Sequence, residues 1–288
     1  MKQYWNRNEF MQKRSLEISC YVLGAGAFGV FFRWLQDQMA FDAAGLAERS
    51  AFNVLVPLLV LAACLLFNKV VEKSQKAKLY IPNEFCPALN APGKPFLWAR
   101  WGGGAVMAIG GAVTIGTCET DPDATMLFIL GILAIASGIA FPLVLGGAND
   151  KMGRLRHPDL ACLGMSLPIA LFALWLVLSY KQNALNSVIW SYLIEMGTMI
   201  VLILAYFRLA GFAFGPVKTW NTLFMTMLGA MMAVMSLADQ RHMGQQIILV
   251  GTALQLVMYE WLLIMNMQQK KRKDRDDQPS PDGFERLR

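Results

Sequence analysis

Charged side chains are scarce in this chain. Asp, Glu, Lys and Arg make up 16% of its 288 residues, whereas soluble domains carry about 25%. Hydrophobic residues reach 56%, and the mean hydropathy is +0.41. This composition, together with several long apolar runs, is typical of polytopic membrane proteins and leaves no room for a separate soluble domain. The net charge of +6 is then explained by membrane topology, so no nucleic-acid partner is expected.

The sequence also lacks the patterns that hold metals or catalytic nucleophiles. Its five cysteines follow no CxxC or Cys/His spacing, and no Ser/His/Asp, HExxH or GxxxxGK[ST] pattern occurs. The two histidines, His157 and His242, fall in predicted loops on opposite sides of the membrane, which excludes bis-histidine haem ligation within the spans. We therefore expect no cofactor and no catalytic residue, and the sequence does not favour an enzyme.

Methionine supplies the one weak metal pattern. Met227, Met231 and Met235 stand four residues apart, on one face of a predicted helix. Thioethers are ligands for Cu(I), but the chain holds 18 methionines, so a stripe arises easily by chance. Flexible filling of gaps between helices is the interpretation that we favour.

Eight apolar runs are long enough to cross a bilayer, which takes about 20 residues. Each is predicted to be an α-helix, because a helix satisfies its own backbone hydrogen bonds in lipid. The first run is too long for the core of a signal peptide, about 7 to 15 residues. The fold class is therefore an all-α bundle of about eight transmembrane helices. The predicted helices are Leu16–Leu35, Phe52–Val71, Leu97–Thr117, Met126–Gly146, Leu160–Tyr180, Val188–Leu209, Trp220–Ala238 and Gln246–Met267.

Basic residues orient the bundle, since cytoplasmic loops carry an excess of Lys and Arg. With the N-terminus in the cytoplasm, 22 of the 26 basic residues fall on the inner side and 4 on the outer side. We expect a cytoplasmic segment 1–15, a transmembrane domain 16–267 and a disordered, charged cytoplasmic tail 268–288. Both termini then face the cytoplasm, and the protein lies in the plasma or inner membrane.

The long inner loop 68–96 contains four prolines, which exclude a continuous helix. We interpret this loop as a surface segment lying against headgroups, where Lys73, Lys76 and Lys78 contact anionic lipid. The Lys270–Lys273 cluster at the start of the tail is expected to do the same. The alternative is that the loop docks a cytoplasmic protein partner.

Glu195 interrupts the run Val188–Leu209 about two turns from its outer end. A carboxylate at this depth is costly in hydrocarbon, so we expect it to face the bundle interior. Its candidate partners are Arg33 and a hydroxyl group of the seventh helix, and its role is either structural or the relay of protons. Arg33 is itself expected to reach up to the outer surface, with pairing to Glu195 as the alternative. Glu260, flanked by an interfacial Tyr and Trp, is expected to reach the membrane surface or to act in the interior.

Small residues recur every four positions in the third helix, at Gly104, Ala108, Ala112 and Gly116. This spacing predicts a face along which another helix approaches closely.

Two function classes fit these features. The first is a transporter or permease for a small solute, with proton coupling through Glu195 as an option. The second is a non-catalytic membrane anchor or regulatory subunit that docks a cytoplasmic partner, of which a quinone-facing redox anchor is a special case. Transport predicts a polar cavity that reaches Glu195, whereas an anchor predicts a closed bundle.

Overall fold

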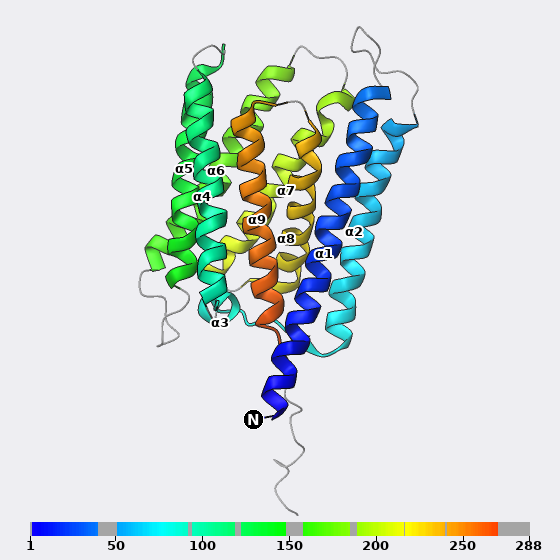
Figure 1. Ribbon diagram of the computed structural model, residues 1–288, viewed down its shortest axis with the longest axis vertical. Coiled ribbons are helices and arrows are strands. Elements are labelled where there is room, and N and C mark those ends of the chain that lie inside the picture. The colour runs from blue at the N-terminus through cyan, green and yellow to red at the C-terminus, as the bar shows by residue number, and fades with distance from the viewer. Residues whose placement is uncertain are drawn as a thin grey trace, which may run out of the picture.

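The computed structural model describes residues 2–39, 51–91, 94–118, 122–147, 158–184, 189–215, 217–239 and 241–269. Helices dominate the described part, and two short strands accompany them (Figure 1). The elements are α1 (Lys2–Met39), α2 (Phe52–Lys76), β1 (Leu79–Tyr80), α3 (Phe85–Leu89), α4 (Lys94–Thr117), α5 (Ala124–Gly147), α6 (Pro158–Asn183), α7 (Ile189–Phe214), α8 (Thr219–Met235), the 3₁₀ turn η2 (Ser236–Ala238), α9 (Met243–Met265) and β2 (Gln268–Gln269).

Seven described helices are long and apolar enough to cross a membrane. They are α1, α2 and α5 to α9, and they confirm an all-α polytopic bundle. The one predicted span outside these seven is Leu97–Thr117, which lies in α4. This helix is also 24 residues long, but its glycines and Arg100 lower its hydropathy. It packs lengthwise against α5 and α9. The start of α1 and the end of α9 lie at the same end of the bundle (Figure 1), as an even number of crossings requires.

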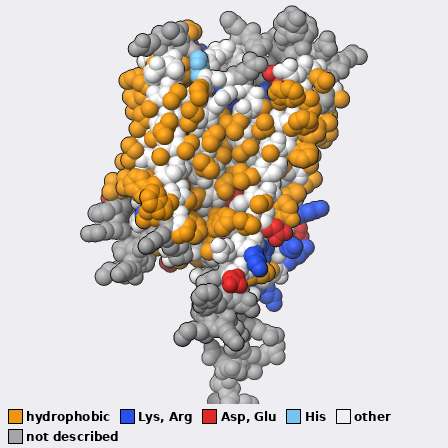
Figure 2. Space-filling model, in the orientation of Figure 1, with side chains coloured by type: hydrophobic (Ala, Val, Ile, Leu, Met, Phe, Trp, Pro, Cys, Tyr) orange, Lys and Arg blue, Asp and Glu red, His pale blue; other side chains and the backbone are white. Residues whose placement is uncertain are grey.

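The surface of the bundle is apolar where a bilayer would surround it. Hydrophobic side chains cover the middle of the face in Figure 2, and charged side chains gather near the lower end of α1 and α2. Leu61, Leu65 and Phe207 are each more than half exposed. Contact of these side chains with water would be unfavourable, but contact with the hydrocarbon of a bilayer is not. They therefore do not need to be buried against other helices.

Helix α9 occupies the centre, between α4, α8 and α1. Glycines let the backbones meet there: a Cβ built on Gly251 would lie 2.7 Å from the backbone nitrogen of Met107 in α4. Likewise, a Cβ built on Gly110 would lie 2.7 Å from the backbone nitrogen of Ile248. These close approaches hold α9 directly against α4.

The predicted small-residue face of α4 holds only in its first half. Gly104 and Ala108 pack against Gly138 of α5, and a Cβ built on Gly138 would lie 3.0 Å from the Ala108 Cβ. By contrast, Ala112 is exposed, and nothing lies within 4 Å of a Cβ built on Gly116. Four residues turn a helix about 40° beyond a full turn, so the last two positions rotate away from α5. The contact continues instead through Gly111, which lies against the Gly131 carbonyl.

Part of the proline-rich loop folds into a cap beneath the bundle, while its expected contact with headgroups stays a prediction. Its short helix α3 is buried, and the Asn266 side-chain amide donates hydrogen bonds to the carbonyl oxygens of Ala88 and Asn90, each at 2.9 Å. Strand β1 pairs with β2 in antiparallel fashion, with Leu79 opposite Gln269. Residues 268 and 269, assigned to a disordered tail, thus form a strand, while the Lys270–Lys273 cluster lies outside the described residues.

Candidate functional site

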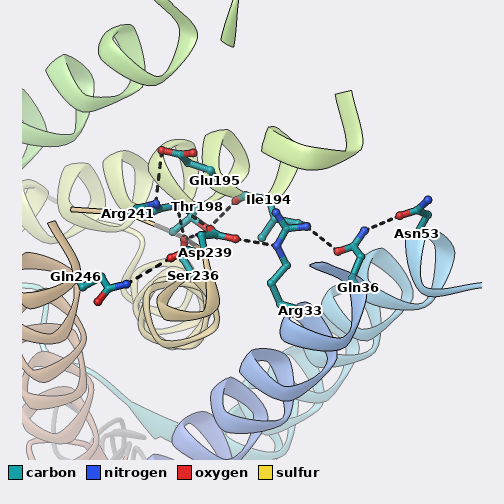
Figure 3. A network of polar contacts seen from close by, with 10 residues as sticks. All are labelled: Arg33, Gln36, Asn53, Ile194, Glu195, Thr198, Ser236, Asp239, Arg241 and Gln246. Carbon is teal, nitrogen blue, oxygen red and sulfur yellow. Dashed lines mark hydrogen bonds and ion pairs between the residues drawn. The ribbon is translucent and has the colours of Figure 1, made fainter. Parts of the chain in front are cut away.

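A group of polar side chains joins the outer ends of several helices, the ends that the sequence analysis assigns to the non-cytoplasmic side (Figure 3). We call this group the outer polar cluster. Its residues come from α1, α2, α7, η2 and the segment before α9, and they include two arginines and two carboxylates. The members are Arg33, Gln36, Asn53, Glu195, Ser236, Asp239 and Arg241.

Asp239 is the centre of this cluster. Its Oδ1 accepts a hydrogen bond from Arg33 Nε at 2.8 Å, and its Oδ2 accepts one from Arg241 Nη2, also at 2.8 Å. The Ser236 hydroxyl donates a further hydrogen bond to Oδ2 at 2.9 Å. Hydrogen bonds between ionised groups are about twice as strong as those between neutral groups, so one carboxylate ties α1 to the α8–α9 connection.

Glu195 faces the bundle interior, but its partner is neither Arg33 nor a hydroxyl of α8. Its Oε1 lies 3.6 Å from Arg241 Nε, which is an ion pair longer than a hydrogen bond. The Glu195 side chain is 19% exposed, whereas that of Arg241 is 4% exposed and stacks over the Trp175 ring at 5.6 Å. Glu195 therefore lies at the open edge of the cluster, and Arg241 lies inside it.

Arg33 does not reach up to the surface, as the sequence had suggested. The residue is 4% exposed, and its Nη1 donates a hydrogen bond to Gln36 Oε1 at 2.7 Å. Gln36 Nε2 in turn donates to Asn53 Oδ1 in α2 at 2.9 Å. Arg33 can stay buried because the carboxylate of Asp239 balances its positive charge. Without that carboxylate, the guanidinium would need contact with water.

Sequence reasoning missed Asp239 and Arg241 because both follow the end of a span and read as ordinary loop residues. The turn η2 ends α8 and folds this connection back toward the bundle, so that Ser236 and Asp239 share a hydrogen bond. A usable signal was present: an acidic and a basic residue lie two positions apart at the depth expected for Arg33 and Glu195.

Glu260 occupies a different place, in the interface between α9 and α1. It is fully buried, which corrects the expectation that it reaches the membrane surface. The Ser19 hydroxyl lies 3.5 Å from its Oε1, and its Oε2 has no hydrogen-bond partner among the described residues. A buried carboxylate without a cation is unfavourable in an apolar interior. Glu260 is therefore a candidate functional residue.

One turn and a half along α9, Gln255 forms a second buried polar contact. The Tyr206 hydroxyl of α7 donates a hydrogen bond to Gln255 Oε1 at 2.9 Å, and Gln255 Nε2 donates one to the Met107 sulfur of α4 at 3.0 Å. Both polar atoms of Gln255 are thus occupied. The contact joins three helices and is explained as structural.

An apolar groove of about 610 Å³ runs between α4 and α9 on the surface of the bundle. We call it the α4/α9 groove. The Gln12 side chain of α1 borders it, and so does Trp261, whose indole nitrogen is buried without a hydrogen-bond partner among the described residues. Apolar residues and glycine form the remaining walls, among them Phe96, Gly102, Val106, Leu254 and Met258.

The methionine stripe belongs to the core. Met227, Met231 and Met235 are fully buried, and a Cβ built on Gly29 of α1 would lie 2.8 Å from the Met235 Cγ. This packing fits gap filling. Within the described residues, no group of three His, Cys, Asp or Glu side chains could hold a metal ion.

No protein-family model, curated protein or solved structure matches this chain. The functional argument therefore rests on the geometry of these groups. That geometry separates an outer polar cluster, exposed only at Glu195, from a groove and an incompletely bonded carboxyl group in the opposite half.

Proposed function

We propose that this multi-pass membrane protein is a non-catalytic anchor that takes a quinone-type ligand from the bilayer into the α4/α9 groove. The observation that carries the proposal is the Trp261 indole N–H, a buried donor without a described partner at the border of an apolar groove. Buried donors are almost always paired. A ligand carbonyl oxygen in the groove would supply the acceptor if the ring turned its N–H toward the groove.

The order of residues along the groove supports a ligand with a polar head and an apolar tail. Gln12 and Trp261 lie toward the end where α1 begins, whereas Leu254 lies seven residues before Trp261, about 10 Å nearer the membrane centre. A head group at Trp261 would therefore place its tail along Leu254 and Val106. Because the groove opens on the lipid-facing surface, its ligand must arrive through the bilayer.

Glu260 supports the quinone class over a simple acyl chain. It precedes Trp261 by one residue, which is about 100° around α9, and it lies against Ser19, which is on the same face of α1 as Gln12, seven residues earlier. Glu260 does not line the groove itself, but its carboxyl oxygen without a described partner lies on the helix turn that carries Trp261 and suits a ligand that exchanges hydrogen bonds or protons. An acyl chain would make no use of this group.

Glycine in α4 offers a direct test. Nothing lies within 4 Å of a Cβ built on Gly102, which borders the groove, or on Gly116, which does not. Gly102→Leu should fill the groove without strain, while Gly116→Leu makes the same change to helix propensity elsewhere in α4. We expect saturable quenching of tryptophan fluorescence by a short-chain menaquinone in nanodiscs, weakened about tenfold or more by Gly102→Leu and unaltered by Gly116→Leu.

Two further arms decide the ligand class. Trp261→Phe should weaken quinone binding about five- to tenfold, the effect of one lost hydrogen bond. Palmitate at equal concentration should fail to displace the quinone. Equal effects of the two glycine variants, or full displacement by palmitate, would overturn the proposal in favour of non-specific lipid contact.

Proton-coupled transport of a small solute is the second candidate, and the partial exposure of Glu195 at the outer end favours it. The described cavities give it less support. Glu195 lines neither the α4/α9 groove, nor a cavity between α1 and α2, nor a third cavity formed by α6, α7 and the segment before α8. Transport predicts that Glu195→Gln abolishes a pH-driven flux in proteoliposomes. An anchor predicts that the same variant changes neither ion nor solute permeability.

For orientation, we propose that both termini face the cytoplasm of the plasma or inner membrane. The 22 to 4 division of basic residues supports this placement, and so does the position of the start of α1 and the end of α9 at one end of the bundle (Figure 1).

A further inference from the structure

A second surface cavity lies between α1 and α2, near the lower end of the bundle in Figure 1, and has a volume of about 370 Å³. Three basic residues line it, Lys13 and Arg14 from α1 and Lys73 from α2, against one acidic residue, Glu17. The Tyr21 hydroxyl donates a hydrogen bond to Glu17 at 3.1 Å. The cavity therefore carries an excess of two positive charges on a lipid-facing surface.

One of the basic groups is held in place by a buried side chain. Arg14 Nη2 donates a hydrogen bond to the Ser74 hydroxyl at 2.7 Å, and Ser74 donates in turn to the Val70 carbonyl oxygen at 2.8 Å. Ser74 is fully buried. A guanidinium carries five N–H donors in a fixed fork, and Ser74 takes one of them, so the fork is positioned for an anion before any ligand arrives.

Charge and hydrophobicity are separated along the cavity. Lys13 and Lys73 lie toward the end where α1 begins, while Tyr21 lies eight residues further along α1, about 12 Å deeper in the membrane. Ile18 and Val70 line the deeper part. The cavity thus has a cationic end at headgroup level, and its deeper walls are apolar apart from the Glu17 carboxylate, which accepts the hydrogen bond of the Tyr21 hydroxyl.

From this arrangement we propose that the α1/α2 cavity binds one anionic phospholipid of the leaflet that faces the termini. The phosphate contacts Arg14, Lys13 and Lys73, and an acyl chain lies along Ile18 and Tyr21. A soluble phosphate compound would match only the cationic end, whereas a phospholipid matches both ends.

The proposal assigns lipid contact to only one of the three lysines that the sequence analysis named in the proline-rich loop. Of the three expected to contact lipid, Lys73 lines the cavity, while Lys76 and Lys78 do not. Lys76 instead forms an ion pair with Glu72 at 2.7 Å on the exposed side of α2. This difference provides matched variants that remove the same charge from the same region.

The test compares two double variants by native mass spectrometry of the full chain in detergent with added lipid. Lys13→Gln with Lys73→Gln should weaken binding of the first phosphatidylglycerol about 30-fold, the effect expected for two lysines near an anionic headgroup. Lys76→Gln with Lys78→Gln should change it less than threefold. Phosphatidylcholine should bind the unaltered protein more weakly, and glycerol phosphate at millimolar concentration should not displace phosphatidylglycerol.

Equal loss in both double variants would overturn the proposal, because it would show a general effect of charge. Equal affinity for phosphatidylcholine, or displacement by glycerol phosphate, would overturn it as well. A measurement on the unaltered protein guards against variants that fail to fold: photoreactive phosphatidylglycerol in nanodiscs should label residues 10–21 and 70–73. Labelling confined to other segments would contradict the site.

Discussion

Asp239 is the residue whose loss should damage the outer polar cluster most. Its two carboxylate oxygens serve Arg33 and Arg241, each at 2.8 Å, and the two arginine side chains are 5% and 4% exposed. Asp239→Asn keeps the size of the side chain and one carbonyl acceptor but removes the negative charge. Both buried arginines then lose the carboxylate that they share, while Arg241 keeps its longer ion pair with Glu195, at 3.6 Å.

Removing one partner from a buried ion pair lowers the unfolding free energy by about 3–5 kcal/mol. Because asparagine retains part of the hydrogen bonding, we expect Asp239→Asn to lie at the lower end, about 3 kcal/mol. The measurement is unfolding by SDS in mixed micelles, followed by far-ultraviolet circular dichroism. The unfolding midpoint should fall while the spectrum of the folded state stays unchanged.

The matched control is Glu72→Gln, which removes a carboxylate from an ion pair on the surface. Glu72 lies 2.7 Å from Lys76, and the two side chains are 52% and 75% exposed. Exposed pairs contribute little to stability because water and salt screen them, so this variant should hardly move the midpoint. If the two variants destabilise the protein equally, the central role of Asp239 is refuted.

A double-mutant cycle isolates the pair itself. Arg33→Gln alone should also destabilise the protein, but the combination with Asp239→Asn should cost less than the sum of the single variants. The expected coupling is about 0.5–3 kcal/mol, the range for residues in one ion-pair network. Additive effects would mean that Arg33 and Asp239 do not act together.

Two other predictions concern packing and the cap. Ala108→Leu should lower the unfolding free energy by about 1–3 kcal/mol, because α5 leaves no room for the added carbons. The control Ala112→Leu, at an exposed position, should stay within about 0.5 kcal/mol of the unaltered protein. If both variants are as thermally stable as the unaltered protein, Ala108 does not face α5. Asn266→Ala removes two hydrogen bonds to the cap, so hydrogen exchange of residues 79–91 should accelerate about tenfold or more while that of α5 stays constant. Unaltered exchange in the cap would show that other contacts hold it.

The sequence predicts the helices well because hydrophobic length is a local property. Glu195 could be assigned to the bundle interior on the same basis, since the unfavourable exposure of a carboxylate to lipid depends on little beyond its depth. Its partner could not be assigned. Arg241 pairs with Glu195 across 46 positions of sequence, and only the fold-back after η2 brings them together.

The proline-rich loop illustrates a different limit. Its prolines exclude a long helix, and that inference holds, but Pro87 lies within the first turn of the five-residue helix α3. Proline is tolerated there because the first turn of a helix leaves its N–H groups without partners inside the helix. Proline spacing alone therefore does not separate a surface loop from a folded cap. The burial of Phe85 and Leu89 against the bundle makes that difference.

Helix α9 links the features of the two halves. Near its start, the Gln246 amide lies 3.5 Å from the Asp239 carbonyl oxygen of the outer polar cluster. Trp261 borders the α4/α9 groove near its other end, and Asn266, five residues further on, holds the cap. Since the start of α9 contacts the outer polar cluster, a ligand that shifts the helix at Trp261 would displace the end beside the cap more than the start. The cap would receive that displacement through Asn266, so occupancy of the groove and exposure of residues 79–91 should vary together.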